Sequence, residues 1–464
     1  MRHPSITVIG GGLVGALLGC LLAKRGMPVA IFEKRADPRR GDFAGGRSIN
    51  LALTERGLHA LRVAGLADSV LAHAVMMRGR MVHPLHGTPG LQRYGIDDSE
   101  VIWSAARGAL NGLQLDAAEQ AGARVHFGQT LAGADFHARR ICLSDAHGTR
   151  REIDADLLIG ADGAGSALRA AMAQAMPLGE RIEPLGHGYK ELEIPPAHVL
   201  PEHVRHAMHG RFALEPHALH IWPRGGYMGI ALPNAEGSFT VTLFLPMRGS
   251  TPSFEQLPDA AAARAFFAQD FADLLPLLSG FDHDYAAHPV GTLATLHLQR
   301  WHLDDRAVLI GDAAHAIVPF HGQGMNCGFE DAVALAERLT AAPGDPGAAF
   351  AAFQDERQPN TEAIATMSVE NYVEMRDSVA DPAFLARRAL GDALAARVPT
   401  HYMSRYRMIS FTRWPYAYAL ERGRQQDTLL DELLAGHTDP TRVDMAAAET
   451  LLRQRLPPLP GAND

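Results

Sequence analysis

The chain has 464 residues, of which 47% are hydrophobic and 20% are charged, as in an ordinary soluble globular protein large enough for more than one domain. Its net charge of −9 argues against general nucleic-acid binding, because no overall basic field attracts phosphates. Cys20, Cys142 and Cys327 are too sparse for a disulfide framework or a zinc cluster. We therefore expect a reducing compartment and no metal site.

The N-terminal segment predicts a βαβ unit. The run "SITVI" predicts a strand, "ALLGCLLAKRG" a helix with a basic and glycine stop signal, and "PVAIFEKR" a second strand. The apolar run leads into glycines rather than a cleavage site, so we expect no signal peptide. No stretch approaches the roughly 20 apolar residues of a spanning helix. We expect a cytoplasmic protein without a stable membrane anchor and with a frayed tail at 455–464; the oligomeric state stays open.

A glycine pattern lies where the first predicted strand meets the helix. Gly10, Gly12 and Gly15 form G-x-G-x-x-G, and Glu33 ends the second strand. Such glycines permit a tight turn and close approach of a pyrophosphate to the helix N-terminus, and such an acid accepts hydrogen bonds from a ribose. A tight turn in an ordinary α/β protein is the alternative. The combination of strand, glycines, helix and acid favours an adenine dinucleotide.

The middle of the chain interrupts this α/β pattern with a β-rich block from about 180 to 290. Within it "FTVTLFLP" alternates strictly, and a Pro-Arg-Gly-Gly turn between two apolar runs predicts a hairpin. The nucleotide-type pattern returns at 306–315, and beyond about 325 the chain reads as mostly helical. We predict an α/β protein with a Rossmann-type FAD-binding domain, an inserted β-sheet substrate domain and a helical C-terminal region. The expected boundaries are 1–75, 100–178 and 290–345 for the first, 76–99 and 179–289 for the second, and 346–464 for the third.

A second glycine-bearing segment, residues 307–332, favours FAD over NAD. An NAD-only domain has no need for it, whereas the ribityl chain and ring of FAD require a cradle of their own. Asp312 can bind ribityl hydroxyls, and Gly322 and Gly324 let the backbone approach the ring. A helix that begins near Met325 and Asn326 would aim its N–H groups at the flavin and favour its anionic reduced form.

Longer strings in the sequence resemble known families. "GDAAHAIVPFHGQGMN" (311–326) resembles the flavin motif of class A aromatic hydroxylases, which have the para-hydroxybenzoate hydroxylase fold. "LIGADGAGSALR" (158–169) resembles their Asp-Gly motif, with Asp162 and Gly163 serving the cofactors. Further strings are similar to the kynurenine 3-monooxygenase family: "GRSINLAL", "MMRGRMVH", "HGYKELEI", "ALHIWP", "FTVTLFLP" and "ENYVEM". The resemblance covers roughly residues 5–420; residues 195–211 match nothing in it.

This resemblance implies a flavoprotein that uses NADPH and O2 to hydroxylate L-kynurenine at ring position 3, through a flavin C4a-hydroperoxide, in tryptophan catabolism. Eukaryotic members carry a C-terminal membrane segment that this chain lacks, so a soluble bacterial-type enzyme is implied. Matching positions imply substrate contacts at Arg80, Tyr94, Asn371 and Tyr406. They imply cofactor contacts at Gly10, Gly12, Val14, Gly15, Glu33, Arg35, Ala52, Arg107, Leu131, Asp162, Asp312, Gly324, Met325 and Asn326.

The residues themselves leave alternatives open for the substrate contacts. Arg80 can hold a carboxylate through two parallel hydrogen bonds, or it can be an exposed arginine. Tyr94 can donate to the same carboxylate or be a half-buried loop aromatic. Asn371 lies in an otherwise apolar helical stripe, so its amide needs a partner, either a neighbouring backbone or a ligand. Tyr406 belongs to an aromatic-rich segment and can equally serve core packing or an interface.

Two further residues near the expected flavin are ambiguous. His321 is a candidate for proton transfer, but an aniline ring already donates electrons and needs less deprotonation than a phenol. A polar loop residue is the alternative for His321. Arg107, at a predicted helix start, can reach the flavin or its phosphates, or form a surface salt bridge.

Other functions on the same fold stay open. The rivals are a phenol hydroxylase, a flavin-dependent reductase, a flavin-binding sensor and an oxidase-like protein that makes peroxide. Because the chain has a single G-x-G-x-x-G, we predict that NADPH docks transiently and that the flavin or a loop moves between reduction and hydroxylation.

Overall fold

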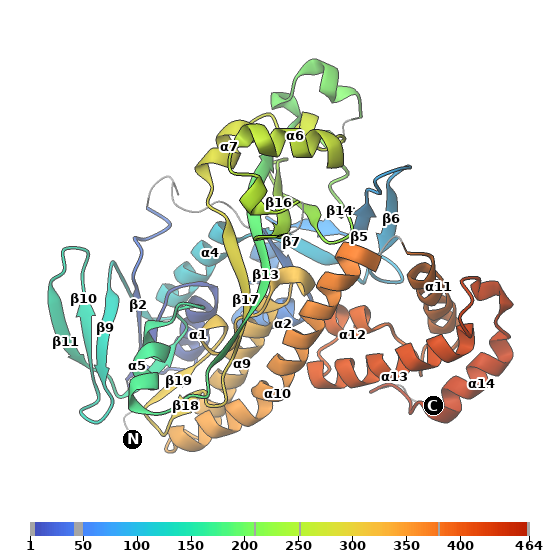
Figure 1. The fold of residues 1–464 in the computed structure, drawn as a ribbon. Coiled ribbons are helices and arrows are strands. Elements are labelled where there is room, and N and C mark those ends of the chain that lie inside the picture. Colours follow the sequence, from blue (N-terminus) through green and yellow to red (C-terminus); the bar gives the residue numbers. More distant parts are fainter. Residues whose placement is uncertain (1–4, 41–49, 208–209, 250–251, 379–380, 462–464) are drawn as a thin grey trace. The chain divides into compact units, whose positions relative to one another are not determined.

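The computed structural model describes residues 5–40, 50–207, 210–249, 252–378 and 381–461. Outside the described residues lie 46–49, the first half of the string "GRSINLAL", and 462–464, the end of the tail. Residues 208–209 of the segment 195–211 lie outside them as well. Figure 1 shows the ribbon of the chain with its helices and strands labelled. The chain divides into two compact units. The first unit comprises Met1–Val75, Trp103–Leu185 and Leu293–Ala365, and the second unit comprises Met76–Ile102, Gly186–Thr292 and Thr366–Asp464.

The first unit is built on a mainly parallel sheet. Within the described residues this sheet has six strands in the order β18-β19-β12-β1-β2-β8, and β18 alone runs antiparallel to its neighbour. The inner strands are short apolar runs buried on both faces, as a covered parallel sheet requires. The strands are β1 (Ile6–Ile9), β2 (Val29–Glu33), β8 (Arg124–Phe127), β12 (Leu157–Gly160), β18 (His302–Leu303) and β19 (Ala307–Leu309).

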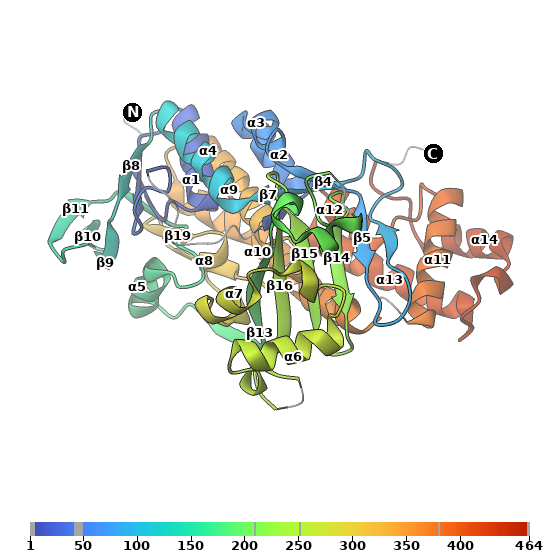
Figure 2. The same cartoon turned by 90° about the horizontal axis from the view of Figure 1, so that it is seen from above.

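The predicted βαβ opening is confirmed, with a helix joining β1 to β2. Gly19 of this helix packs closely on the sheet, since a Cβ there would lie 2.5 Å from Ile31 Cδ1. The helices α1, α4 and α9 lie side by side (Figure 2). The helices of the unit are α1 (Leu13–Lys24), α2 (Glu55–Ala64), α3 (Ala67–Leu71), α4 (Arg107–Gln120), α5 (Ala167–Ala175), α8 (Asp312–His315), α9 (Gly324–Ala341) and most of α10 (Pro346–Val373). A small antiparallel sheet joins β9 (Thr130–Asp135), β10 (Arg140–Ser144) and β11 (Arg150–Asp154). Another three-stranded sheet has the order β3 (Asn50–Leu53), β7 (Ile102–Ala106) and β4 (Val75–Met77), of which Met76, Met77 and Ile102 are assigned to the second unit.

The second unit carries the predicted β-rich block. Its sheet has the described strands in the order β17-β13-β16-β15-β14-β5-β6. The predicted hairpin is β14 and β15, and Gly225 and Gly226 turn between them with φ of 61° and 100°. On β16 the side chains of Phe239, Val241 and Leu243 are buried, as the alternation predicts. The strands that lie wholly or partly in this unit are β5 (Gly79–Val82), β6 (Gly90–Arg93), β13 (Arg181–Ile194), β14 (Ala218–Pro223), β15 (Met228–Pro233), β16 (Phe239–Pro246) and β17 (Gly291–His297).

The region beyond residue 325 is mostly helical, as predicted. Leu390, Leu394 and Leu452 belong to an apolar cluster of their own within the C-terminal helices. None of the helices in the described part of the chain is long and apolar enough to cross a membrane. The remaining helices are α6 (Ala260–Asp270), α7 (Phe281–Ala287), α11 (Pro382–Arg397), α12 (Arg405–Phe411), α13 (Tyr416–Leu434) and α14 (Met445–Arg455), with a π-helix at Glu374–Ser378.

Candidate active site

The glycines that follow β1 have different structural roles. Gly10 has a φ of 104°, and a Cβ there would lie 2.4 Å from the Ala161 carbonyl oxygen. A Cβ at Gly15 would lie 1.9 Å from the Gly10 carbonyl oxygen, so both positions require glycine for the fold itself. A Cβ at Gly12, the N-cap of α1, would meet no heavy atom within 4 Å among the described residues. Gly12 thus leaves open space at a helix N-terminus, where a pyrophosphate can approach.

Glu33 places a buried carboxylate beside this turn. One carboxylate oxygen accepts from the Gly11 N–H at 2.8 Å, and the other accepts from Arg35 N and Nε at 3.0 and 2.8 Å. Burial opposes the charge of Glu33, but the hydrogen bonds from Arg35 and Gly11 outweigh it and lower the pKa. Glu33 is therefore an ionised acceptor, and a carboxylate has lone pairs left for ribose hydroxyls.

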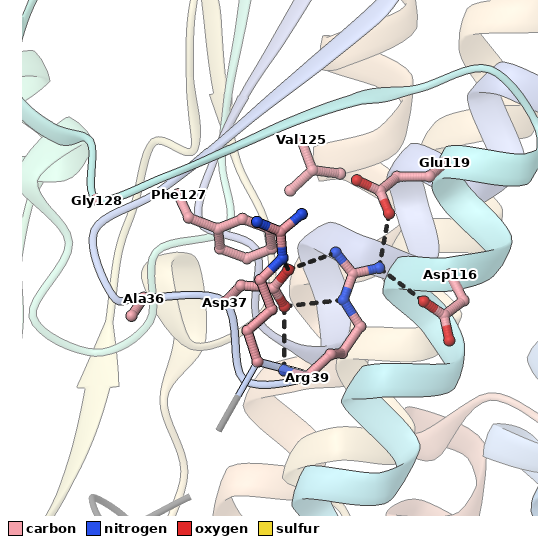
Figure 3. Close-up of a pocket in the computed structure, with 9 residues that line it drawn as sticks. Ala36, Asp37, Arg39, Asp116, Glu119, Val125, Phe127 and Gly128 are labelled. Atoms are coloured by element: carbon pink, nitrogen blue, oxygen red, sulfur yellow. Dashed lines mark hydrogen bonds and ion pairs between the residues drawn. The ribbon is translucent and has the colours of Figure 1, made fainter. Parts of the chain in front are cut away.

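A surface pocket of about 780 Å³ lies just beyond the end of β2 (Figure 3). Its main cation, Arg39, pairs with Asp37 at 2.8 Å, Asp116 at 2.7 Å and Glu119 at 2.6 Å. Those carboxylates already neutralise the guanidinium, so Arg39 offers little charge to a phosphate. We therefore place no cofactor group in this pocket.

The turn after β19 presents Asp312. Gly311 adopts a φ of 57°, and a Cβ there would lie 3.2 Å from Val14, so this turn packs against the first glycine motif. Asp312 is exposed to solvent, yet surrounding protein raises the pKa of its carboxyl, while His315 and Arg107 act in the opposite direction. Both facts fit a carboxyl that lines a hollow and can receive a hydroxyl-bearing ligand.

The start of α9 is held by the side chain of Asn326. Its Nδ2 donates to the Ala52 and Gly322 carbonyls at 2.8 Å each, and its Oδ1 accepts from the Thr54 N–H at 3.0 Å. Gly322 has a φ of 64° and would place a Cβ 2.9 Å from that of Ala52. The Asn326 side chain therefore bonds to protein. The first N–H groups of the helix, which have no intrahelical acceptor, are what it can offer a flavin.

The other predicted cofactor residues occupy varied surroundings. Leu131 is 7% exposed in the core of the first unit. Asp162 accepts from the Ser166 hydroxyl at 2.5 Å and the Ala167 N–H at 2.7 Å, so it holds the start of α5. Met325 is half-buried in the first turn of α9, and His321 is buried directly before Gly322.

These features fit FAD. The open space at Gly12 suits a pyrophosphate, the buried Glu33 carboxylate suits a ribose, and Asp312 suits a polyol chain. All of these groups belong to the first unit.

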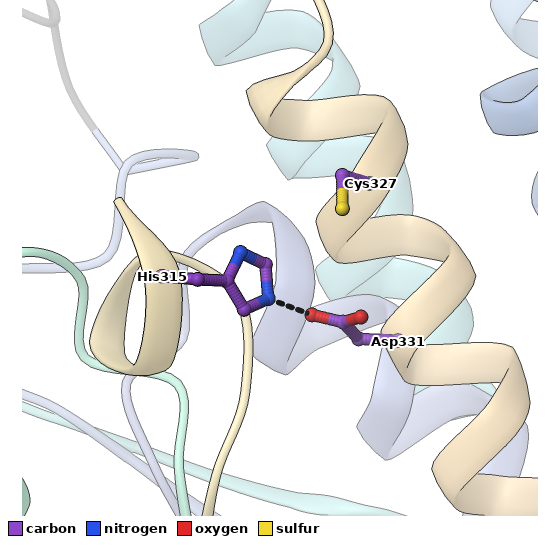
Figure 4. A group of neighbouring side chains, drawn as sticks. All are labelled: His315, Cys327 and Asp331. Atoms are coloured by element: carbon purple, nitrogen blue, oxygen red, sulfur yellow. Dashed lines mark hydrogen bonds and ion pairs between the residues drawn. The ribbon is translucent and has the colours of Figure 1, made fainter. Parts of the chain in front are cut away.

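A buried group of metal-ligand type, His315, Cys327 and Asp331, also lies in the first unit (Figure 4). Arg357 Nε lies 2.8 Å from Asp331, and Arg357 Nη2 lies 3.3 Å from Cys327 Sγ. The Arg357 guanidinium thus already contacts two of the groups that a metal ion would need as ligands. Burial also raises the pKa of the Cys327 thiol, which keeps the thiol protonated. The geometry favours an ion-pair network over a metal site.

A charged cluster on the second unit surrounds Arg80. Arg80 is 8% exposed; its Nη2 donates to Glu374 at 2.9 Å and its Nε donates to Gln92 at 3.1 Å. Arg388 Nη1 donates to the same Gln92 oxygen at 2.9 Å. Burial and the nearby Arg80 lower the pKa of Arg388. The exposed alternative for Arg80 is therefore wrong.

The predicted tyrosines meet beside this cluster. The rings of Tyr94 and Tyr406 stack with centroids 4.8 Å apart at 16°. Burial raises the pKa of Tyr94 to about 12, although Arg80 and Tyr406 act in the opposite direction. Tyr94 consequently keeps its proton and can donate a hydrogen bond to an anion near Arg80.

Asn371 lies in the buried helical stripe that its spacing predicts. Ile364, Met367, Ser368 and Met375 of this stripe are all buried, and Asn371 is 7% exposed. The Asn371 Nδ2 donates to Met375 Sδ at 3.3 Å, a weak acceptor for an amide.

The sequence patterns did not predict Gln92, Glu374 or Arg388 as site residues. Glu374 follows Asn371 by three residues, so helical spacing alone could have placed both on one face. Gln92 lies directly opposite Arg80 in the antiparallel β5–β6 pair, so the register of that pair brings them together. No local signal in the sequence points to Arg388, because it lies on α11 and approaches Arg80 only through the tertiary fold.

Comparisons with known sequences agree with this geometry. A family profile described as "FAD binding domain" matches residues 4–227 and 275–368. Kynurenine 3-monooxygenase of Stenotrophomonas maltophilia is 55% identical over 460 residues, covering 99% of this chain and 98% of the relative. Kynurenine 3-monooxygenase of Xanthomonas axonopodis pv. citri is 55% identical over 464 residues, covering 100% of this chain and 99% of the relative.

Solved structures show the same fold at low identity. The tetrameric form of 2-methyl-3-hydroxypyridine-5-carboxylic acid oxygenase matches with a TM-score of 0.65 and 20% identity, covering 83% of this chain and 96% of that chain. PqsL of P. aeruginosa in complex with 2-aminobenzoylacetate matches with a TM-score of 0.62 and 21% identity, covering 81% and 97%. These similarities confirm the predicted fold class.

Proposed function

The chain belongs to the kynurenine 3-monooxygenase family, and on that premise we propose that it converts L-kynurenine to 3-hydroxy-L-kynurenine with NADPH and O2. The observation that carries the proposal is identity of 55% with such enzymes over 99% of the chain. The charged cluster around Arg80 supports it independently, because an amino-acid substrate needs partners of both signs.

FAD is the cofactor of this reaction; when bound, it supplies the redox chemistry that couples NADPH oxidation to oxygen insertion. Gly12 would leave room for its pyrophosphate, Glu33 would accept from its ribose, and Asp312 would accept from its ribityl hydroxyls. The start of α9, from Gly324 to Asn326, would direct N–H groups and the positive helix end at the flavin. The remaining residues proposed as its contacts are Gly10, Val14, Gly15, Arg35, Ala52, Arg107, Leu131 and Asp162.

The Arg80 cluster suits the α-carboxylate and α-ammonium of kynurenine. Arg80 and Arg388 supply positive charge, while Glu374 supplies one carboxylate. Asp392 lies 3.9 Å from Arg388 but its side chain is 71% exposed, so solvent screens that pair. The excess positive charge favours a carboxylate ligand, and Glu374 is placed to accept from an ammonium group.

The aromatic pair would complete this recognition. The protonated Tyr94 hydroxyl can donate to the substrate carboxylate, and the stacked Tyr406 ring keeps water from that side. Asn371 supplies a buried amide near the end of α10, three residues before Glu374. These roles follow from the contacts of the second unit taken alone.

His321 is our candidate for a proton-transfer residue. It is 8% exposed beside Gly322. Because an aniline already donates electrons to its ring, we expect this role to add less than it would for a phenol.

We also propose the cytoplasm as the compartment and the division into a FAD-binding domain, a substrate domain and a helical region given above. The sparse cysteines, all free in the structure, support the compartment.

The test of the function is NADPH consumption by the purified, FAD-loaded protein with and without L-kynurenine, with the product identified by mass. We expect strong stimulation and one added oxygen atom. Peroxide equal to the NADPH consumed, whatever aromatic is added, would point instead to an oxidase or sensor. Stimulation by phenols but not by kynurenine would point to a phenol hydroxylase.

A further inference from the structure

The carboxylate of Asp331 is a junction inside the first unit. It accepts from His315 Nε2 at 2.5 Å and from the Gly311 N–H at 3.0 Å on one oxygen, and from Arg357 Nε at 2.8 Å on the other. Asp331 is 0% exposed, and Arg357 and His315 are each 6% exposed. A buried carboxylate depends on such donors, because its charge would be costly without them.

The donors of Asp331 connect two segments that we assign to the cofactor. Gly311 directly precedes Asp312, and the hydrogen bond fixes the turn that aims the Asp312 side chain. Asp331 itself lies on α9, whose first residues face the flavin in our proposal. The same carboxylate therefore sets the spacing between the Asp312 turn and the helix start.

A second carboxylate in the same network lacks this connection. Glu330 accepts from Arg56 at 2.7 Å and from Arg357 at 3.1 Å. Neither of these arginines belongs to the turn before Asp312. Glu330 therefore serves as a matched control. Both Glu330 and Asp331 bind Arg357, and Glu330 directly precedes Asp331 in the chain.

We propose that Asp331 is a positioning residue for FAD, which holds the Gly311–Asp312 turn in register with helix α9 so that Asp312 and the helix start bind the flavin together. This inference rests on the proposed cofactor site. Arg357 and His315 then stabilise the negative charge of Asp331, and the group does not bind a metal ion.

The test compares Asp331→Asn with Glu330→Gln in the full chain after removal of FAD. Asparagine keeps the volume of the side chain, but its amide nitrogen would face a donor, so one of the three contacts is lost. FAD affinity is measured by quenching of flavin fluorescence. The visible spectrum and the reduction potential of the bound flavin are measured alongside the thermal midpoint of each apoprotein.

We expect Asp331→Asn to weaken FAD binding by roughly tenfold or more, the equivalent of one charge-assisted hydrogen bond, and to shift the flavin potential. Glu330→Gln should lower the thermal midpoint but leave FAD affinity within about twofold of wild type. Equal affinity, spectrum and potential in the two variants would overturn the inference. Failure of wild-type protein to bind FAD would instead overturn the proposed function.

If Asp331→Asn does not fold, Arg357→Lys carries the same test. Lysine keeps the positive charge but loses the planar fork that bonds Asp331 and Glu330 at once. Weakened FAD binding with an altered flavin spectrum would support the inference, and unchanged binding and spectrum would contradict it.

Discussion

The Arg80 guanidinium lies 2.9 Å from the Glu374 carboxylate, although 294 residues separate them in the chain. The pair joins strand β5 to the π-helix that ends α10. Because π-helical turns are frequent at functional sites and buried ions need partners, we expect this contact to lie at the substrate-binding site.

Arg80→Lys should raise the KM for L-kynurenine by roughly tenfold, because lysine keeps the charge but loses bidentate bonding to a carboxylate. The kcat should change by less than about threefold, since the loss falls on binding in ground and transition states alike. Steady-state kinetics at saturating NADPH would measure both. Arg224→Lys, in the same unit but bonded to backbone carbonyls, is the control; an equal effect there would contradict specific recognition by Arg80.

Glu374→Gln should strongly reduce the preference for substrates that carry the α-ammonium group. We expect wild type to prefer L-kynurenine over its deaminated analogue by about 10- to 100-fold in kcat/KM, and the variant by only a few-fold. The comparison needs both substrates on both proteins. The decarboxylated analogue is the internal control, because Arg80 should still reject it in the variant; loss of both preferences would indicate a general collapse of the cluster.

Gly12→Ala should separate cofactor binding from folding. Its Cβ would enter open space in the described structure, so the free energy of unfolding of the apoprotein should change by less than about 1 kcal/mol. FAD affinity should nevertheless fall at least roughly tenfold, because the methyl group would occupy the approach of the pyrophosphate. Gly10→Ala should instead lower the free energy of unfolding by about 2–4 kcal/mol through backbone strain and overlap with Ala161. Urea unfolding and FAD titration of both variants would show whether this division holds.

Acid should weaken the contribution of Asp331 to stability. Burial opposes its charge, but His315 and Arg357 outweigh burial and lower the pKa from 3.8 to about 2. Because the pKa of Asp331 is lower in the folded than in the unfolded state, its ionised carboxylate stabilises the fold at pH values above the unfolded-state pKa of 3.8. This contribution is lost as the pH falls toward 2. The difference in free energy of unfolding between wild type and Asp331→Asn should therefore shrink by about 1 kcal/mol from pH 6 to pH 3. Urea unfolding of the two apoproteins across this range is the measurement, and a difference independent of pH would refute the assigned shift.

The sequence by itself determined the local elements of this protein. The βαβ opening, the glycine turn, the alternation of β16 and the buried stripe around Asn371 all depend on the spacing of apolar residues and on backbone preferences of glycine. Those signals act over a few residues, so they can be read without knowing the fold. The long motif strings also indicated the family, and the family in turn implied the cofactor and the proposed substrate.

The tertiary structure alone decided which side chains share a charge network. The meeting of Arg80 with Gln92, Glu374 and Arg388 depends on strand register and helix packing, which no local spacing specifies. The same holds for Asp331, whose hydrogen bond to Gly311 crosses 20 residues to reach the turn before Asp312. Asn326 illustrates the difference. Its motif predicts a position at the flavin, whereas the fold shows that its side-chain amide donates to the Ala52 and Gly322 carbonyls. A buried polar group must be satisfied wherever the packed chain supplies a partner, and only the folded chain determines where that partner lies.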